Sequence, residues 1–289
     1  MRDKVCVITG ATDGIGKAAA FDLAARGARL LLHGRDPDKG ARVVEDIKAR
    51  TGNPAIEFLQ ADFSSLAEVR RLAAAILARV PRVDVLVNNA GGVFAKRQVS
   101  KDGYEMTFAV NHLAPFLLTQ LLLSTLKSSA PSRIVTTSSA AHKGARIPFD
   151  DLQATRRYSA MGAYGTSKLA NILFTHALAK RLQGTTVTAT CFHPGFVRTS
   201  FGRGFDSNPI AKHLFRWVSR FARTPEKGAE TLVYLATSAE VGGASGGYYF
   251  DCKLTTTSAA AQDAAAAERL WQVSEQLVGS AVVSSPDAH

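Results

Sequence analysis

Cysteine is scarce in this chain of 289 residues, and its three copies, Cys6, Cys191 and Cys252, lie far apart. Because no Cys-x-x-Cys pair occurs, the sequence offers neither a disulfide framework nor a zinc ribbon. The seven histidines also lack the His-Glu-x-x-His spacing of a helical zinc site. We therefore expect no metal in this protein.

Long hydrophobic runs are missing as well. The N-terminal apolar run, VCVI, is too short for the hydrophobic part of a signal peptide. The longest apolar segment, residues 113–126, is interrupted by polar residues and is too short to span a bilayer. We therefore expect no transmembrane segment and a cytoplasmic location.

Acidic residues are outnumbered, since 35 Lys and Arg against 24 Asp and Glu give a formal net charge of +11. Such an excess can attract nucleic acid, anionic membranes or acidic ligands. Here the basic residues are scattered, and the densest clusters are the short pairs of Arg70 with Arg71 and Arg156 with Arg157. We expect no nucleic-acid partner, and a basic surface that also attracts phosphorylated cofactors.

Short apolar runs alternate along the chain with amphipathic stretches of helical length. Continuous apolar strands that alternate with helices indicate a parallel sheet covered on both faces. Neither a repeat nor a linker interrupts the pattern, so we predict one α/β domain with a doubly wound parallel sheet over residues 1–278, and a flexible tail at 279–289. The predicted strands are 4–10, 28–34, 55–62, 83–91, 133–139 and 185–195, and the predicted helices include 16–26, 37–50 and 66–79.

The glycine-rich stretch TGATDGIGK follows the first predicted strand and suits a phosphate-binding turn. A triphosphate-binding loop needs four residues between Gly and Gly-Lys, followed by a hydroxyl. Here five residues separate Gly10 from Gly16, and Ala18 occupies the hydroxyl position. The spacing of Gly10, Gly14 and Gly16 instead suits a strand–turn–helix unit that binds the pyrophosphate of a dinucleotide, as in a Rossmann fold. A glycine-rich turn without a ligand is the alternative.

The end of the second predicted strand, HGRD, bears on the choice of dinucleotide. A protein that prefers NAD places an acid here for the ribose hydroxyls, whereas a guanidinium pairs with the 2′-phosphate of NADP. Because Arg35 precedes Asp36, we predict that NADP(H) is preferred over NAD(H). The alternative is that Arg35 is a surface residue and Asp36 reaches the ribose.

Tyr164 and Lys168, in YGTSK, lie four residues apart at the start of a helical pattern and so share one helix face. The ammonium of Lys168 can stabilise a tyrosinate and lower the pKa of Tyr164 toward neutrality. Tyr164 then becomes a general acid for carbonyl reduction or a base for alcohol oxidation. Such a pair is common by chance, but Ser139 and the stretch NNAG also end predicted strands, where ligands of parallel sheets bind.

Together these motifs resemble the short-chain dehydrogenase/reductase family, from about Val5 to Cys252. The resemblance implies that Ser139 binds the substrate oxygen, that Tyr164 exchanges the proton and that Ser138 is a neighbouring structural hydroxyl. It further implies that Lys168 also binds the nicotinamide ribose and that Asn111 holds a water. The cofactor-binding residues that it implies are Gly10, Thr12, Asp13, Gly14, Ile15, Gly16, Arg35, Asp62, Phe63, Asn89, Ala90, Gly91, Tyr164, Lys168, Pro194, Gly195, Val197 and Thr199.

The interval between Ser139 and Tyr164 is longer than in the commonest family pattern. This insert, together with SSAAH, HPGFVRT and GGYYFDCK, resembles the retinol-dehydrogenase-like branch, which includes the WW-domain oxidoreductases. Members with Arg at the position of Arg35 tend to use NADP. The membrane-bound retinol enzymes carry a hydrophobic N-terminal anchor that this sequence does not show, so we do not extend the resemblance to retinoid activity.

Residues 199–224 combine apolar side chains with Arg and Lys. Its apolar residues are Phe201, Phe205, Ile210, Leu214, Phe215, Trp217 and Phe221. The segment suits a lid over a lipophilic substrate, a membrane-surface helix or plain packing against the core.

From all these features we predict an NADP-dependent oxidoreductase of a small-molecule carbonyl or alcohol, with a homo-oligomer through the long helices as one option. The competing hypothesis is a catalytically silent protein that senses NADP(H).

Overall fold

The computed structural model describes residues 1–197 and 222–280 of the chain. Its centre is an eight-stranded sheet in the order β3-β2-β1-β4-β5-β6-β7-β8. All neighbouring strands are parallel except β7 and β8, which form an antiparallel hairpin. The strands are β1 Val5–Ile8, β2 Arg29–Gly34, β3 Ile56–Gln60, β4 Val85–Asn88, β5 Ser132–Thr137, β6 Val187–Phe192, β7 Tyr248–Phe250 and β8 Lys253–Leu254.

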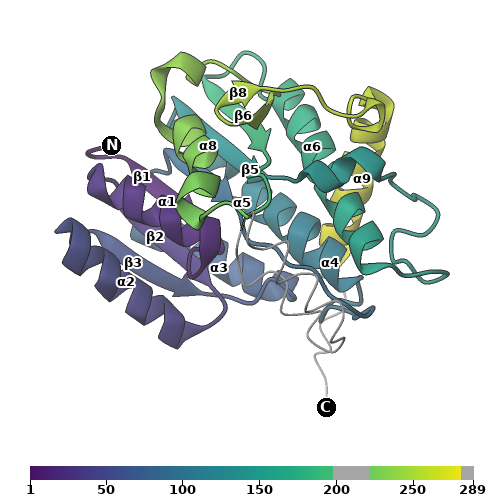
Figure 1. Ribbon diagram of the computed structural model, residues 1–289, viewed down its shortest axis with the longest axis horizontal. Helices are drawn as coiled ribbons and strands as arrows, with labels where there is room; N and C mark the ends of the chain where they lie inside the picture. Colours follow the sequence, from purple (N-terminus) through teal and green to yellow (C-terminus); the bar gives the residue numbers. More distant parts are fainter. Residues whose placement is uncertain (198–221, 281–289) are drawn as a thin grey trace.

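Helices cover both faces of the sheet (Figure 1). One layer contains α1, α2 and α8, and the other contains α3, α5 and α6 with α9 packed on its outside. The helices are α1 Gly14–Ala25, α2 Pro37–Thr51, α3 Leu66–Arg79, α4 Met106–Phe108, α5 Ala114–Ser128, α6 Ala160–Arg181, α8 Pro225–Thr237 and α9 Ala264–Ser280. Short turns are η1 Ala109–Leu113, η2 Ala140–Gly144, η5 Ala239–Val241 and η6 Ala259–Ala261.

Successive residues of the central strands enter different hydrophobic cores. In β1, Val7 belongs to the core under α3, α5 and α6, whereas Cys6 and Ile8 belong to the core under α1, α2 and α8. This alternation explains the continuous apolar runs in the sequence, because side chains on both faces are buried. The prediction of a single α/β domain with a doubly wound parallel sheet is confirmed.

The predicted strands and helices occur close to their expected positions, with shifts that have local causes. Helix α1 begins at Gly14 rather than Gly16, because Asp13 caps it by accepting a hydrogen bond from the Gly14 N–H. The sequence pattern did not predict α8, the β7–β8 hairpin or α9. Helix α9 runs to Ser280, so the predicted tail cannot begin at residue 279, and residues 281–289 lie outside the described part of the chain.

Helix α9 ties the C-terminal part of the chain to the helices on one face of the sheet. Trp271 packs edge-on against Phe116, with ring centroids 5.0 Å apart, and stacks on Phe174 at 6.0 Å. The guanidinium of Arg181 lies over the Trp271 ring, 4.0 Å from its centroid. Helix α9 packs on α6, one of the long helices that the oligomer prediction invokes, and the oligomeric state itself stays a prediction.

Among the described residues, one helix, Met106–Ser128, is long and apolar enough to cross a membrane. Its apolar window is 72% buried inside the fold. Phe108, Phe116 and Leu122 on this helix belong to the core. Its length and composition are therefore also those of the core helix of a globular domain.

Candidate functional site

The predicted site residues gather at one edge of the sheet, where the parallel strands end. The glycine turn follows β1, and the NNAG stretch follows β4, the next strand in the sheet. Strand order reverses between these two strands, since β1 lies beside both β2 and β4. In an open α/β sheet, such a switch point leaves a crevice at the carboxyl edge, and ligands bind there.

The glycine turn needs glycine for two different reasons. Gly10 and Gly14 have φ of 65° and 53°, a region that side chains with a Cβ rarely adopt. At Gly16 the constraint is space, because an added Cβ would lie 2.3 Å from the Gly10 carbonyl oxygen. The turn thus leads at once into the N-terminus of α1, whose N–H groups and positive dipole end suit a pyrophosphate.

Thr9, which the sequence analysis missed, joins this turn to the stretch after β4. Its hydroxyl donates to the carbonyl oxygen of Val87 at 3.1 Å and accepts from the N–H groups of Asn89 and Ala90 at 2.9 and 3.0 Å. The amide of Asn89 donates in return to the carbonyl oxygens of Thr9 and Gly10, at 3.0 and 3.2 Å. The side chain of Asn89 therefore holds the backbone of the turn.

On the side expected to bind adenosine, the side chains of Arg35 and Asp36 have different surroundings. Arg35 is exposed, whereas the carboxylate of Asp36 caps α2 by accepting from the Lys39 N–H at 3.0 Å. That hydrogen bond lowers the pKa of Asp36 below its ordinary value. Thr12 lies beside them, because a Cβ added to Gly34 would be 2.6 Å from its methyl carbon.

Asp62 and Phe63 follow β3 and differ in exposure. Burial acts to raise the pKa of Asp62, but hydrogen bonds with Ser64 and the charges of Lys101 and Arg35 hold it below its ordinary value. Phe63 is buried, and its ring stacks on His33 with centroids 4.2 Å apart. Asp62 is thus partly exposed, whereas the Phe63 ring belongs to the hydrophobic core.

Lys168 and Tyr164 meet on α6, as their spacing predicts. The ammonium nitrogen of Lys168 lies 5.5 Å from the centroid of the Tyr164 ring. It also donates a hydrogen bond to the carbonyl oxygen of Thr137, at the end of β5, at 3.1 Å. Burial lowers the pKa of Lys168 to about 8, because the charged form loses its hydration.

The predicted lowering of the Tyr164 pKa is wrong for this structure. Burial raises the pKa of Tyr164 to about 12, and a hydrogen bond with Ser139 only partly opposes the increase. Loss of hydration thus dominates the pKa of Tyr164, and the spacing of Tyr164 and Lys168 alone does not set its direction. The phenol is protonated near neutral pH, which suits a proton donor.

The two serines after β5 have different partners. Ser138 is buried, and its hydroxyl donates to the main-chain carbonyl of Lys168 at 2.8 Å, which ties β5 to α6. The Ser139 hydroxyl accepts the Ala141 N–H at 3.2 Å, as the cap of turn η2. With its lone pair engaged in this way, the Ser139 hydroxyl can direct its proton toward Tyr164.

Asn111 lies in the π-helical turn η1, a deviation from the α-helix that often marks functional sites. Its amide oxygen accepts the Gly92 N–H at 2.8 Å, and its amide nitrogen donates to the Gly92 carbonyl and to Ser167. A Cβ added to Gly91 would lie 3.1 Å from the Asn111 oxygen and 3.4 Å from the Lys168 nitrogen. Asn111 and Lys168 therefore converge under the NNAG stretch.

The stretch after β6 brings Gly195 and Val197 near the same crevice. Gly195 has a φ of 80°, and a Cβ added to Gly228 would meet Val197 at 2.6 Å and Ile15 at 3.2 Å. Pro194 precedes this glycine in the same loop. Thr199 and the predicted lid residues Phe201, Phe205, Ile210, Leu214, Phe215, Trp217 and Phe221 lie outside the described residues.

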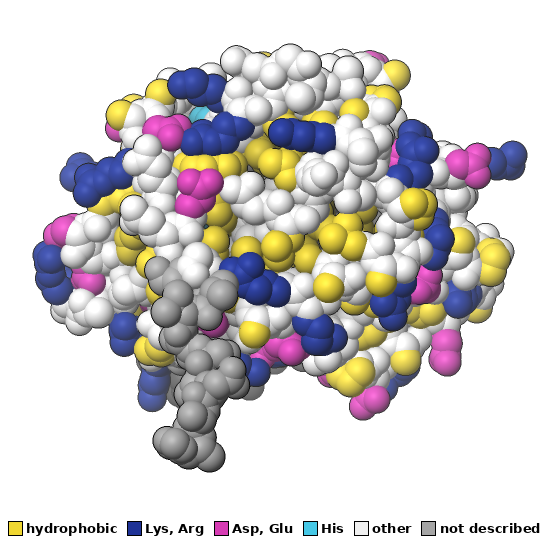
Figure 2. Space-filling view, turned by 180° about the vertical axis from the view of Figure 1, so that it is seen from behind, with side chains coloured by type: hydrophobic (Ala, Val, Ile, Leu, Met, Phe, Trp, Pro, Cys, Tyr) yellow, Lys and Arg dark blue, Asp and Glu magenta, His cyan; other side chains and the backbone are white. Residues whose placement is uncertain are grey.

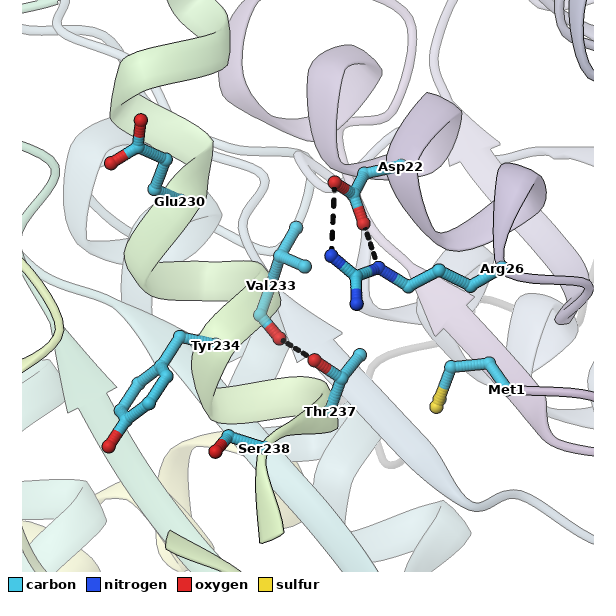
Figure 3. Close-up of a pocket in the computed structure, with 8 residues that line it drawn as sticks. All are labelled: Met1, Asp22, Arg26, Glu230, Val233, Tyr234, Thr237 and Ser238. Carbon is cyan, nitrogen blue, oxygen red and sulfur yellow. Dashed lines mark hydrogen bonds and ion pairs between the residues drawn. The ribbon is translucent and has the colours of Figure 1, made fainter. Parts of the chain in front are cut away.

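A surface groove of about 530 Å³ lies elsewhere, between α1 and α8 (Figure 3). Figure 3 shows Asp22 and Arg26 of α1 paired on one side, with Glu230 and Tyr234 of α8 on the other. Its described lining includes none of the predicted catalytic or cofactor residues. The groove is therefore separate from the crevice at the carboxyl edge.

The fold and this geometry define a dinucleotide-binding α/β oxidoreductase. The model of the short chain dehydrogenase family matches residues 4–209, and the chain belongs to this family, in a retinol-dehydrogenase-like branch. Retinol dehydrogenase 14 of Homo sapiens is 43% identical over 96% of this chain and 87% of its own length.

Solved structures show the same fold. An uncharacterized protein from Mycobacterium Paratuberculosis has a TM-score of 0.77 and 34% identity, over 96% of this chain and 94% of its own. The NADP complex of Pseudomonas aeruginosa RhlG has a TM-score of 0.69 and 28% identity, over 86% of this chain and 94% of its own.

Proposed function

We propose that this chain transfers hydride reversibly between NADP(H) and a carbonyl or alcohol, and that its substrate is lipophilic. The observation that carries the proposal is the meeting of Ser139, Tyr164 and Lys168 at the carboxyl edge of the sheet. A protonated phenol, a serine hydroxyl and a buried ammonium suit the polarisation and protonation of a carbonyl oxygen.

Bound over the glycine turn of Gly10, Gly14 and Gly16, a nicotinamide cofactor would supply the hydride for the carbonyl carbon. Ser139 donates a hydrogen bond to the carbonyl oxygen and stabilises the negative charge that develops there. Tyr164 transfers its phenolic proton to that oxygen, which completes the alcohol. Lys168, held by the Thr137 carbonyl, stabilises the phenolate, and Asn111 holds a water that returns a proton from solvent.

Two features support NADP(H) as the preferred cofactor. Arg35 is exposed beside Thr12 at the end of β2, where a guanidinium can form paired bonds with a 2′-phosphate. Asp36, the acid that would otherwise bind ribose hydroxyls, is engaged as the cap of α2. The RhlG structure named above is an NADP complex, which agrees with this choice.

The lipophilic substrate class has a different basis. It follows from the apolar character of residues 199–224 and from the name of a curated relative, a retinol dehydrogenase. Nucleic acid is not favoured as a partner: Figure 2 shows Lys and Arg spread over one face among acidic and apolar side chains, without a continuous basic stripe.

The test is NADPH consumption by the purified protein with small aldehydes, aromatic ketones, steroids and retinal. We expect turnover that Tyr164→Phe abolishes, since the variant keeps the ring but has no proton to donate. Turnover that survives in Tyr164→Phe contradicts the assigned proton donor. Tight NADPH binding without any turnover would instead favour the catalytically silent sensor.

A paired experiment separates the two cofactor assignments. We expect Arg35→Ser to lower kcat/KM for NADPH by about 10- to 100-fold, because one charge-assisted paired contact is worth about 1.5–3 kcal/mol, while kcat/KM for NADH is little changed. Asp36→Asn keeps a capping side chain and leaves both values nearly unchanged. A selective loss with NADH in Asp36→Asn shows that Asp36 reaches the ribose.

A further inference from the structure

His142 is a buried imidazole in turn η2, three residues after Ser139, and the reaction proposed above does not use it. Its Nδ1 lies 2.7 Å from the main-chain carbonyl oxygen of Ser139. Because that oxygen only accepts, Nδ1 carries the proton and donates. Nε2 is then an acceptor, and the N–H of Ser258 points to it at 3.4 Å. One neutral tautomer satisfies both contacts.

Ser139 is held on both sides by this turn. Its carbonyl oxygen receives the imidazole N–H of His142 and also the backbone N–H of the same residue, at 3.2 Å. Its hydroxyl accepts the Ala141 N–H. The orientation of the Ser139 hydroxyl, which bonds Tyr164 in this structure and would bond the substrate oxygen in the proposed reaction, therefore depends on a peptide unit that the His142 ring fixes.

The ring of His142 is itself wedged in place by β7. Tyr248 packs edge-on against it, with centroids 5.1 Å apart, and the Tyr248 hydroxyl lies 3.4 Å from Nδ1. His193, after β6, stacks on Tyr248 at 5.7 Å and on Phe250 at 4.1 Å. Burial lowers the pKa of His142 below its ordinary value, which favours the neutral ring that its contacts require.

We infer that His142 is a positioning residue of the reaction, which holds the peptide carbonyl of Ser139 and so aims its hydroxyl at the substrate oxygen. The inference rests on the proposed function. It assigns to His142 no contact with substrate or cofactor and no proton transfer. Its effect is expected on the chemical step and not on cofactor binding.

The first variant is His142→Phe, which fills the space under Tyr248 but has no N–H for the Ser139 carbonyl. We expect kcat for carbonyl reduction to fall by about 10- to 100-fold, since small misplacement of a reacting group costs this much. KM for NADPH shows whether cofactor binding is affected, and we expect it to stay within about twofold of wild type. The midpoint of urea unfolding shows whether the variant is less stable.

Conservative variants distinguish positioning from packing. His142→Asn places an amide N–H close to the position of Nδ1, whereas His142→Gln places it nearer Nε2. We therefore expect His142→Asn to recover more of kcat than His142→Gln, with both similarly stable. If His142→Phe does not fold, this pair alone decides, and equal kcat in the two variants overturns the inference.

His176 offers a matched control for loss of an imidazole that anchors the C-terminal segment. Its ring lies near the main-chain groups of Gly246 and Ala261, next to the Ser258 region, and no described contact joins it to Ser139. We expect His176→Phe to keep kcat near wild type. Equal losses of kcat in His142→Phe and His176→Phe overturn the inference while leaving the proposed function intact. Absence of turnover in the wild type overturns both.

Discussion

The ammonium nitrogen of Lys168 lies 5.5 Å from the centroid of the Tyr164 ring. Lys168 is buried, and Tyr164 is partly buried. Burial affects the two groups in opposite ways, because it disfavours the charged form of each. The pKa of Lys168 falls to about 8, and the pKa of Tyr164 rises to about 12. Of the two groups, Lys168 is therefore the one whose charge changes closest to physiological pH.

This relationship predicts how carbonyl reduction depends on pH. Tyr164 stays protonated throughout the range from pH 6 to 9, so the proton donor is not limiting. Lys168 loses its charge as pH rises through about 8, and with it the stabilisation of the phenolate. We expect kcat/KM to be level below this pH and to decline above it, as measured by initial rates with NADPH in buffers of constant ionic strength.

Lys168→Met provides the control for that profile. Without the ammonium, we expect kcat/KM to fall by at least about 100-fold, within the range typical of lost acid–base and electrostatic assistance. The decline centred near pH 8 should then disappear from the remaining activity. A decline that persists in Lys168→Met assigns it to another group.

The glycine turn predicts a substitution with a strong effect on cofactor binding. In Gly16→Ala the new Cβ would lie 2.3 Å from the Gly10 carbonyl oxygen and 2.5 Å from the amide nitrogen of Asn89, so the turn has to move. We expect the Kd for NADPH, measured by fluorescence titration, to rise at least about tenfold, which is 1.4 kcal/mol.

Gly243→Ala is the matched substitution, since an added Cβ there has no atom within 4 Å. We expect its Kd for NADPH to equal that of wild type. If both variants bind NADPH as wild type does, the close contact of Gly16 with Gly10 is not needed for the cofactor site.

Much of the fold was predictable because buried parallel strands leave continuous apolar runs, and the polar residues that follow such strands share one edge. Other features depend on contacts between distant segments. Thr9 looked like part of a glycine turn, and its bonds to the stretch after β4 require the pairing of β1 with β4. The direction of the Tyr164 pKa depends on burial, which the spacing of Tyr164 and Lys168 does not contain. Strand β7 is a short segment whose neighbours only the folded sheet defines.

The buried histidines predict loss of stability at mildly acidic pH. His33 and His112 are buried, and burial lowers the pKa of each from 6.5 to about 4. Between these values the unfolded chain binds protons that the native state does not, so stability is lost as pH falls. Each such histidine gives a slope of up to about 1.4 kcal/mol per pH unit.

Urea unfolding at pH 7.5, 6.0 and 5.0 measures this dependence. His112→Phe replaces the imidazole, which contacts Ser274 and the ring of Phe108, by a side chain that does not titrate. We expect the variant to be less stable at pH 7.5 but to lose less stability between pH 6 and 5 than wild type. An equal slope in both proteins shows that His112 is protonated in the native state or that the unfolded state is perturbed in the same way.

The packing of α9 predicts a large stability effect from one side chain far from the reacting groups. Trp271 is 5% exposed and lies between Phe116, Phe174 and the guanidinium of Arg181. Trp271→Ala removes these contacts and leaves a cavity, so we expect a loss of about 3–5 kcal/mol in the free energy of urea unfolding. Leu77→Ala on α3, where the leucine is 42% exposed, should change it by no more than about 0.5 kcal/mol. Similar values for the two variants mean that α9 is not part of the cooperative unit, since a helix that detaches before the main transition contributes little to its free energy.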